Sequence, residues 1–554
     1  MCIPPPSWTN ALHRNGVKAL GTFLVEPQSR DISKILHRTR SGTNGWNYTL
    51  ASQLTRIARF YGFDGWLINI EKTFPIIDWS LPKLEGFLKQ LQSSFDDGCV
   101  IWYDSLTRDN RIDYQNALTE RNTVFIKAAG SILTNYAWTP ETAAATNAFA
   151  LQNDIDPSNI LCGIDVWAQS SERETYPKHI GGGTGTGLGV AKLAELELSA
   201  GVFGPAWPYE HFNCLPDSIA VERAMWTGAA LPEILRCDCL SSSRHHIKGY
   251  MESPILASTQ DFPAGSDAFF YTDFMQAFEM VTGSSAAPEK TQERANLASQ
   301  SVLPRATVHT STQKEIFGRV ESSPSRLSVY ICALNGYVRA QRTLSLFKLS
   351  IPASKGLLIC ITYRRPEKPT PLYVWLELEG LGVRIPIAKQ QGTITTELQT
   401  NETDTLTGIS LQVEAHFGTI TTSPLLVAEI MSICVRRSRK ATRNYTISDA
   451  IFVEIDESDS VLSWKFNNEA WNAIPEDVGL PYSDLTGPFS FFLIEIDARQ
   501  AGRAYAMEYV LRGIGDESDV RITGIGFDGE VICVYTGSLR KRQRQGSAES
   551  WQLV

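Results

Sequence analysis

The sequence predicts an α/β protein, with a TIM (β/α)8-type barrel whose first strand is missing, followed by two β-sandwich-like domains. In the first half, short apolar runs recur about 30 to 60 residues apart with helical stretches between them, a rhythm typical of βα units. One of these runs, residues 63–71, is apolar enough to be a strand covered on both faces. Beyond residue 305 the pattern changes to alternating apolar and polar residues, which is typical of half-buried strands.

The barrel strands are expected at seven runs of the first half: residues 17–26, 65–71, 99–105, 131–138, 160–167, 200–207 and 268–274. A barrel of this type has eight parallel strands. We therefore expect the chain to lack the first strand, which would lie upstream of the present start, or to form a barrel with an open seam.

Changes in composition divide the chain further. Residues 1–282 are the expected catalytic barrel, and the linker 283–304 follows, because this region is rich in glycine, serine, alanine and proline. The alternating runs at 327–331 and 373–378 predict a β-sandwich-like domain over 305–444. The last segment, 445–554, resembles a fibronectin-type III sandwich in its strand spacing.

Composition excludes several functional classes. The formal net charge of −9 argues against a general nucleic-acid binder. The start carries no basic segment followed by an apolar one, and no apolar run approaches the roughly 20 residues that cross a bilayer. The 10 cysteines are scattered singly, apart from Cys237 and Cys239, whose spacing is shorter than that of usual zinc ligands. We expect a cytosolic protein with reduced thiols, no metal, no nucleic acid and no membrane partner.

The run 63–71, Phe-Asp-Gly-Trp-Leu-Ile-Asn-Ile-Glu, ends in two polar residues. Because side chains alternate across a strand, Asn69 and Glu71 share one face at its C-terminal end, where barrels of this type carry their chemistry. An amide and a carboxylate so spaced also occur as capping or loop-anchoring pairs. The pair suits an acetamido sugar, since the acid protonates a glycosidic oxygen while the amide holds the 2-acetamido group for attack by the sugar's own carbonyl oxygen.

The same run resembles the catalytic strand of the glycoside hydrolase family 85 endo-β-N-acetylglucosaminidases, which cleave the GlcNAc–GlcNAc bond in the core of N-glycans. Further motifs resemble that family in order along residues 1–280: Ile3-Pro4-Pro5, Trp8-Thr9-Asn10, Leu20-Gly21-Thr22-Phe23, Trp102-Tyr103-Asp104-Ser105, Thr134-Asn135-Tyr136, Gly163-Ile164-Asp165-Val166 and Phe203-Gly204-Pro205. The resemblance implies a retaining hydrolysis through an oxazolinium intermediate. It implies no cofactor, and as partners N-glycans of glycoproteins or glycopeptides and free oligosaccharides.

The resemblance also implies a division of roles. Glu71 is expected to act as general acid and then as base, and Asn69 to stabilise the intermediate through the acetamido group. Tyr103, in the motif Trp-Tyr-Asp-Ser, is expected to hydrogen-bond the same group. An ordinary position at the edge of the core is the alternative for Tyr103.

Five further residues are expected to bind the substrate. Trp138 and Trp207 end predicted strands and are candidates to stack on sugar rings, although most of the 13 tryptophans must be core. Asp165 is a candidate partner for a hydroxyl group, or else a carboxylate that orients loops, and Asn135 is a candidate from Thr-Asn-Tyr. Tyr114 lies where the family commonly has a tryptophan on the acceptor side, so transglycosylation and glycan preference stay open.

Other functions compete with this hypothesis. The glycine-rich run 181–189 is typical of dinucleotide loops, but it does not directly follow a predicted strand, so a loop at the barrel mouth is favoured. A glycan-binding protein that has lost turnover is one alternative. A chitinase-like acetamidosugar hydrolase is another, disfavoured because Leu67 and Asn69 replace the carboxylates of such enzymes. The oligomeric state stays open.

Overall fold

A computed structural model gives the structure of the chain. It describes residues 1–42, 45–95, 99–167, 185–233, 235, 253–260, 262–276, 278–281, 292–295, 300–304, 316–322, 324–332, 340–354, 356–366, 372–415, 424–437, 446–454, 459–466, 480–512, 517–542 and 550–553. The pair Cys237 and Cys239, residues 181–184 of the glycine-rich run and most of the expected linker lie outside these ranges.

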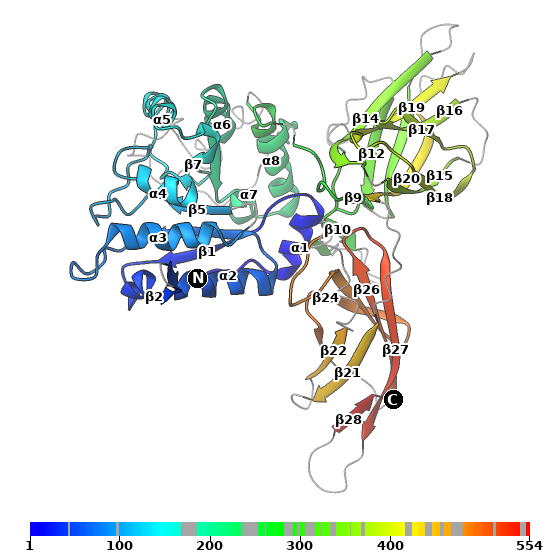
Figure 1. Ribbon diagram of the computed structural model, residues 1–554. Helices are drawn as coiled ribbons and strands as arrows, with labels where there is room; N and C mark the ends of the chain where they lie inside the picture. The colour runs from blue at the N-terminus through cyan, green and yellow to red at the C-terminus, as the bar shows by residue number, and fades with distance from the viewer. Residues whose placement is uncertain are drawn as a thin grey trace. The chain divides into compact units, whose positions relative to one another are not determined.

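The chain forms two compact units, and each draws on more than one stretch of sequence. The first consists of Met1–Pro4, Ala19–Arg59 and Phe63–Asp261, and the second of Pro5–Lys18, Phe60–Gly62 and Phe262–Val554. Helices and parallel strands alternate in the first unit, whereas strands dominate the second (Figure 1).

An all-parallel sheet forms the centre of the first unit. Its six strands are hydrogen-bonded in chain order: β1 (Leu20–Val25), β4 (Gly65–Ile70), β5 (Cys99–Tyr103), β6 (Gly130–Leu133), β7 (Ile160–Asp165) and β8 (Ser199–Phe203). The connecting helices are α2 (Thr49–Tyr61), α3 (Leu81–Gln92), α4 (Thr123–Ala129), α5 (Pro140–Gln152), α6 (Thr186–Glu195), α7 (Trp207–His211) and α8 (Leu215–Thr227). Parallel strands meet with their carboxyl ends at one edge, so the loops that follow them lie together.

Large aromatic side chains fix which face of the sheet meets the helices. The indole of Trp66 on β4 donates to the carbonyl oxygen of Leu54 on α2 at 3.1 Å. On β5, the buried ring of Trp102 stacks on Phe125 of α4 at 4.3 Å between centroids. Residues that alternate with these, such as Asn69, therefore point to the opposite face.

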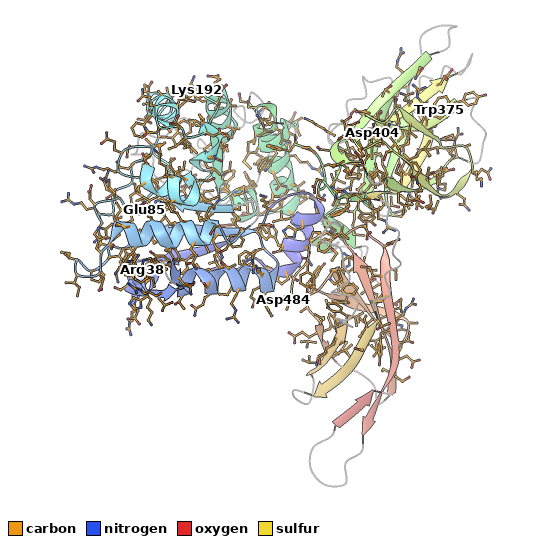
Figure 2. All side chains as sticks on the ribbon, viewed as in Figure 1. Arg38, Glu85, Lys192, Trp375, Asp404 and Asp484 are labelled. Carbon is orange, nitrogen blue, oxygen red and sulfur yellow. The ribbon has the colours of Figure 1, made fainter. Side chains whose placement is uncertain are left out.

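The outer surfaces of the helices carry charged pairs. Lys89 and Glu85 on α3 lie 3.4 Å apart, and Lys192 and Glu195 on α6 lie 2.6 Å apart (Figure 2). Exposed pairs of this kind contribute about 0–1 kcal/mol each to the free energy of unfolding. The helices are therefore held mainly by their buried apolar faces.

The expectation of seven barrel strands is corrected in one place. The segment 268–274 does form a strand, β9 (Phe269–Thr272), but it pairs antiparallel with β20 (Leu425–Arg437) of the second unit. Its rings explain the difference, because Phe270 and Phe274 are buried and Phe270 lies 4.7 Å from the ring of Phe347. An apolar run predicts a buried strand and does not indicate which sheet the strand joins.

The edge strand β1 has a partner on part of its outer side. The backbone nitrogen of Cys2 donates to Thr22 O at 2.8 Å, and the nitrogen of Thr22 donates to Cys2 O at 2.9 Å. These two bonds satisfy backbone groups that would otherwise be left at the edge.

Two antiparallel sheets open the β-rich part of the second unit. One is ordered β12 (Ile316–Ser322), β13 (Ser325–Ile331), β20, β15 (Leu357–Arg364) and β18 (Gln391–Leu398), with β9 also on β20. The other is ordered β14 (Ala340–Pro352), β19 (Thr405–Ala415), β16 (Leu372–Glu379) and β17 (Val383–Pro386). Their inward residues, for example Ile359 on β15 and Leu411 on β19, belong to one buried apolar cluster. The short strands β10 (Phe278–Val281) and β11 (Gln292–Ala295) pair antiparallel.

Two more sheets follow in the C-terminal region. They are ordered β21 (Ile447–Glu454), β22 (Asp459–Phe466), β25 (Glu508–Arg512), and β24 (Arg499–Ala504), β23 (Phe489–Ile496), β26 (Glu517–Gly526), β27 (Val531–Arg542), β28 (Ser550–Leu553). Trp464 of the first sheet packs on Phe492 of the second at 5.0 Å between ring centroids. Both rings belong to one buried cluster, which holds the two sheets together.

The first helix, α1 (Pro6–Arg14), belongs to the second unit. The amide of Asn10 donates to the carbonyl oxygen of Ser490 on β23 at 2.7 Å. Gly16 follows the helix with a φ of +73°, and a Cβ there would lie 1.8 Å from the carbonyl oxygen of Gly265. Only glycine fits this close approach without a shift of backbone.

None of the eight cysteines in the described ranges forms a disulfide. No helix of that part of the chain is both long and apolar enough to span a lipid bilayer.

Candidate active site

Asn69 and Glu71 lie together at the carboxyl end of β4, on the face opposite Trp66. The amide nitrogen of Asn69 donates to Glu71 Oε1 at 3.4 Å. The backbone nitrogen of Glu71 donates to Val25 O at 2.7 Å, which carries the pairing with β1 one residue beyond the strand. Both side chains are half-buried. The predicted juxtaposition of amide and carboxylate is confirmed.

The amide oxygen of Asn69 is buried, and no group in the described part of the chain donates a hydrogen bond to it. An unsatisfied buried acceptor costs about 1–3 kcal/mol of stability. Buried polar atoms of this kind are uncommon and call for an explanation. A ligand that brings an N–H group to this oxygen would satisfy it.

Tyr103 and Asn135 continue the polar group on the neighbouring strands. The hydroxyl of Tyr103 at the end of β5 donates to Asn135 Oδ1 at 3.0 Å, and both side chains are buried. Burial raises the pKa of Tyr103 well above its usual value, and Tyr136 and the charge of Glu71 raise it further. Burial, with the nearby Asp165, raises the pKa of Tyr136 to about 12. Both phenols are protonated at neutral pH, and the hydroxyl of Tyr103 acts as a hydrogen-bond donor.

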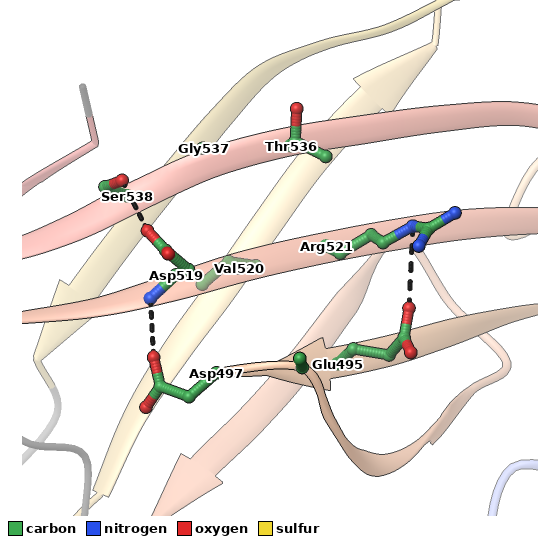
Figure 3. Close-up of a pocket in the computed structure, with 9 residues that line it drawn as sticks. Glu495, Asp497, Asp519, Val520, Arg521, Thr536, Gly537 and Ser538 are labelled. Carbon is green, nitrogen blue, oxygen red and sulfur yellow. Dashed lines mark hydrogen bonds and ion pairs between the residues drawn. The ribbon is translucent and has the colours of Figure 1, made fainter.

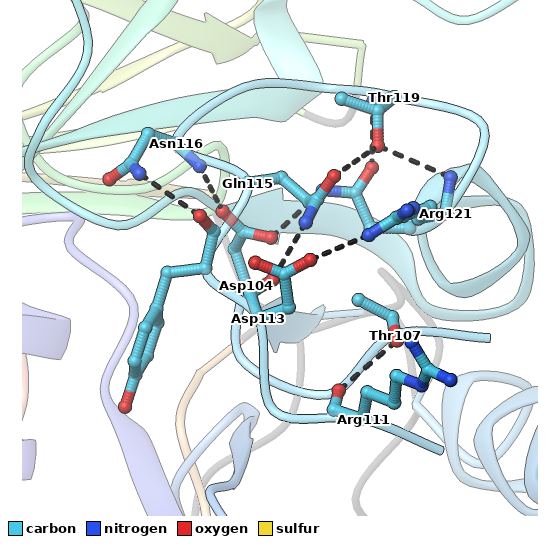
Figure 4. Close-up of polar contacts among 10 residues, drawn as sticks. Asp104, Thr107, Arg111, Asp113, Gln115, Asn116, Thr119 and Arg121 are labelled. Carbon is cyan, nitrogen blue, oxygen red and sulfur yellow. Dashed lines mark hydrogen bonds and ion pairs between the residues drawn. The ribbon is translucent and has the colours of Figure 1, made fainter. Parts of the chain in front are cut away.

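A buried carboxylate, which the sequence did not single out, orders the surrounding loops. Asp104 is 2% exposed and accepts from Asn122 Nδ2 at 2.9 Å, Asn116 N at 2.7 Å and Asn135 N at 3.5 Å. Asn116, at a φ of 54°, in turn accepts from Asn135 Nδ2 at 2.8 Å and from Ala137 N at 2.9 Å. Figure 4 shows Asp104 facing Asn116 within this loop. The network fixes Asn135, and Asn135 fixes the hydroxyl of Tyr103.

Replacement of Asp104 by asparagine is expected to destabilise the first unit by about 1–3 kcal/mol, because one accepting oxygen becomes a donor that faces other donors. Burial outweighs the accepted hydrogen bonds and raises the pKa of Asp104 to about 6. The folded state therefore holds this proton more tightly than the unfolded chain. The stabilisation that the raised pKa of Asp104 gives the folded state is complete below the pKa of this group in the unfolded chain, and it is lost as pH rises through about 6. The loss of unfolding free energy caused by Asp104→Asn should therefore be larger near pH 4.5 than near pH 7.5.

Denaturant unfolding at the two pH values measures this difference. The matched control is Asp113→Asn in the same loop, because Asp113 forms an exposed ion pair with Arg121 at 2.6 Å (Figure 4). Loss of such a pair costs about 0–1 kcal/mol. Equal unfolding midpoints for the two variants would contradict the structural role of Asp104.

The two tryptophans expected to stack on sugars lie in the core. Trp138 is 1% exposed, and its indole donates to Gly163 O at 2.8 Å. Trp207 is also 1% exposed, and His211 stacks on it at 4.7 Å between centroids. Protein atoms cover both rings, so this arrangement does not favour their predicted role. The sequence position of a tryptophan near a strand end does not show whether other parts of the protein bury its ring.

Other aromatic rings are exposed beside the polar group. Tyr114 is 39% exposed and meets the ring of Tyr103 edge-on at 6.4 Å. Phe203 at the end of β8 is 52% exposed and lies 5.5 Å from the ring of Tyr136. The structure thus brings the predicted Tyr114 to the site and adds Phe203, which the sequence did not select.

Asp165 ends β7 beside this group. Its Oδ1 accepts from the backbone nitrogen of Trp167 at 3.0 Å, and its charge contributes to the raised pKa of Tyr136. It therefore orients its own loop and also lies close to Tyr136, so both predicted roles of Asp165 stay open.

A different hollow, of about 820 Å³, lies on the C-terminal sheet across β23, β26 and β27 (Figure 3). Its polar groups bond to one another: Asp497 Oδ1 accepts from Asp519 N at 2.8 Å, Asp519 Oδ1 accepts from Ser538 Oγ at 2.7 Å, and Arg521 lies 3.5 Å from Glu495. The described residues that line it include no aromatic ring. These features favour the strand ends of the first unit as the active site.

Comparison with known proteins agrees with this position. The model of glycosyl hydrolase family 85 matches residues 1–280, a stretch that contains every predicted site residue. The chain belongs to glycosyl hydrolase family 85. The site described above therefore lies within the part of the chain that defines the family.

Relatives from animals and plants resemble the family 85 region. The cytosolic endo-beta-N-acetylglucosaminidase of Gallus gallus is 36% identical over 215 residues, 38% of this chain and 28% of the relative. The cytosolic endo-beta-N-acetylglucosaminidase 1 of Arabidopsis thaliana is 36% identical over 231 residues, 41% of this chain and 31% of the relative. The match thus spans about a third or less of these relatives' own length.

A solved family structure resembles almost the whole chain. The glycoside hydrolase domain of Endo-D from Streptococcus pneumoniae R6 aligns with a TM-score of 0.64 over 97% of this chain and 84% of that one. At 14% sequence identity, this likeness establishes the fold alone. The chain thus has a family 85-type α/β fold.

Proposed function

We propose that this chain hydrolyses the GlcNAc-β-1,4-GlcNAc bond in the core of N-glycans, with retention of configuration and through an oxazolinium intermediate. The observation that carries the proposal is the buried amide oxygen of Asn69, which accepts no hydrogen bond from the described residues and lies two residues from the carboxylate of Glu71. The names of the cytosolic endo-beta-N-acetylglucosaminidases support the bond specificity.

The chemistry begins with the sugar's own acetamido group. Its carbonyl oxygen attacks the anomeric carbon while Glu71 gives its proton to the oxygen of the departing GlcNAc. Asn69 Oδ1 accepts the acetamido N–H, which orients the group and increases the electron density on its carbonyl oxygen. Because no described residue donates to it, this oxygen has the hydrogen-bonding capacity that the step requires.

The second half reverses the proton transfer. The Glu71 carboxylate removes a proton from water, the water oxygen attacks the anomeric carbon from the face the aglycone left, and the oxazolinium ring opens. The configuration at the anomeric carbon is thereby restored. Tyr103 is a neutral phenol at neutral pH, and its hydroxyl donates to the acetamido group when substrate displaces it from Asn135.

Residues at the surrounding strand ends make the substrate contacts beyond the acetamido group. We assign sugar stacking to the exposed rings of Tyr114 and Phe203, and hydroxyl contacts to Asp165 and Asn135. The buried Trp138 and Trp207 would take part only if a loop moved to uncover them.

The same proposal extends to architecture and location. The six parallel strands support a TIM-type barrel as the catalytic domain, and the paired antiparallel sheets support two β-sandwich-like domains over 305–444 and 445–554 after a linker. The names of the relatives support the cytosol, with N-glycans of glycoproteins or glycopeptides and free oligosaccharides as partners.

A glycopeptide with a single N-glycan tests the function. The expected products are a peptide that keeps one GlcNAc and a glycan that ends in the other, both identified by mass spectrometry. Proton NMR of the fresh glycan should show the β-anomer first, as retention requires. Binding without release would favour a glycan-binding protein, and release from chitin oligomers would favour a chitinase-like hydrolase.

A further inference from the structure

The loop that follows Glu71 presents two isoleucines to solvent. Ile76 is 91% exposed and Ile77 is 93% exposed, more than any other large apolar side chain in the described ranges. Full burial of one such side chain is worth about 1.5–3 kcal/mol. Two adjacent isoleucines left in water, beside an active site, point to a binding partner.

Hydrogen bonds fix the loop in this arrangement. The amide of Asn110, in the next βα loop, accepts from Phe74 N and donates to Phe74 O, both at 2.8 Å. Phe74 itself is buried, and its ring packs on Trp79 at 5.4 Å between centroids. The loop therefore uses its aromatic residues for anchorage, and its exposed residues Thr73 and Pro75 to Ile77 include the two isoleucines.

Backbone hydrogen bonds close the turn between Phe74 and Trp79. Pro75 O accepts from Asp78 N at 2.9 Å and from Trp79 N at 3.0 Å. The carboxylate of Asp78 accepts from Ser33 Oγ at 2.6 Å, which ties the turn to the loop after β1. The isoleucines lie at the tip of an anchored turn, and they cannot bury themselves unless these bonds break.

The position of the turn indicates which part of a substrate would meet it. In the proposed function, on which this inference rests, Glu71 protonates the oxygen of the departing GlcNAc, so the departing sugar and its attached polypeptide lie on the side of Glu71. The turn begins at Phe74, three residues after Glu71, and Asn110 in the loop that follows the next strand anchors it at the same end of the sheet. It is therefore among the segments closest to the aglycone.

The chemistry of the two side chains indicates the occupant. Isoleucine has no hydrogen-bonding group for sugar hydroxyls and no flat ring to stack on a pyranose. Branched aliphatic side chains bind other apolar side chains, and an unfolded polypeptide exposes these. We propose that Ile76 and Ile77 bind apolar residues of the unfolded polypeptide on either side of the glycosylated asparagine, and that they set a preference for such substrates.

Three substrates with one glycan test the proposal. The first is a glycopeptide whose asparagine is flanked by leucine, valine and phenylalanine, the second is flanked by serine and glycine, and the third is the free glycan that ends in the chitobiose unit. The wild-type chain is expected to prefer the first peptide to the second by about tenfold in kcat/KM, through KM. Ile76→Ser with Ile77→Ser should abolish this preference and leave kcat/KM on the free glycan unchanged.

The control is Leu151→Ser on α5, another apolar residue that is 59% exposed. It should keep the preference. If the wild-type chain released glycan from both peptides equally well, the inference would be overturned and the proposed function would stand. The same holds if the preference for the first peptide survived the double substitution. No release from any of the three substrates would overturn the proposed function and the inference with it. Self-association that the double substitution removes, without a peptide preference, would show that a second copy occupies the turn and would also overturn the inference.

Discussion

Glu71→Gln is expected to keep the fold and lower the rate of glycan release by about 10²–10⁴-fold, the usual contribution of a general acid. Glutamine has nearly the shape of glutamate, and its amide oxygen can still accept the 3.4 Å hydrogen bond from Asn69. It cannot give a proton to the leaving oxygen or recover one from water. Quantitative mass spectrometry of the released glycan measures the loss.

Two further measurements separate catalysis from binding and folding. Calorimetric titration with the glycopeptide should give a similar dissociation constant for the variant and the wild type. The matched control is Glu85→Gln on α3, where the carboxylate pairs with Lys89 at the surface, and it should leave release unchanged (Figure 2). Turnover by Glu71→Gln within a few-fold of the wild type would contradict the assignment of Glu71 as the general acid.

Asn69→Ala is expected to lower hydrolysis of the natural glycopeptide by about 10²–10³-fold, comparable to the loss of one preorganised hydrogen-bonding group at a reaction centre. The variant loses the buried acceptor for the acetamido N–H, so the oxazolinium ring forms more slowly. A preformed sugar oxazoline already contains this ring. Transfer from that donor to a GlcNAc-bearing acceptor should therefore survive in part, and liquid chromatography of the transfer product measures it.

Tyr103→Phe provides the comparison for Asn69. It removes the hydroxyl that donates to Asn135 Oδ1 at 3.0 Å, with little change of shape. A partial loss of hydrolysis is expected, smaller than for Asn69→Ala. If Asn69→Ala loses both activities equally while Tyr103→Phe loses neither, the substrate-assisted mechanism is placed on the wrong residues.

The sequence predicted local features of the fold well and their assembly less well. The runs around Trp66 and Trp102 were correctly predicted as strands, since burial on both faces leaves a clear apolar signature. The run around Phe270 has the same signature but joins β20, where Phe270 pairs with Val435, 165 residues later. Pairing partners depend on the whole fold, and a local pattern does not contain this information.

The candidate site likewise contains residues that the sequence could predict and residues that it could not. Asn69 and Glu71 could be predicted because two-residue spacing on a strand fixes their common face. Asp104 was missed, although a carboxylate directly after the strand-end residue Tyr103 was a signal that could have found it. Its role depends on Asn116, 12 residues on, in a left-handed backbone conformation that the sequence does not reveal. The burial of Trp138 likewise depends on distant segments.

The assignment of α1 to the second unit has a consequence for biosynthesis. Asn10 bonds to Ser490, 480 residues later in the chain. At translation rates of about 5–20 residues per second, roughly 24 to 96 seconds separate the synthesis of the two partners. Over that interval the first segment has no β23 on which to dock, so α1 can take its place in the second unit only after the last strands have been made.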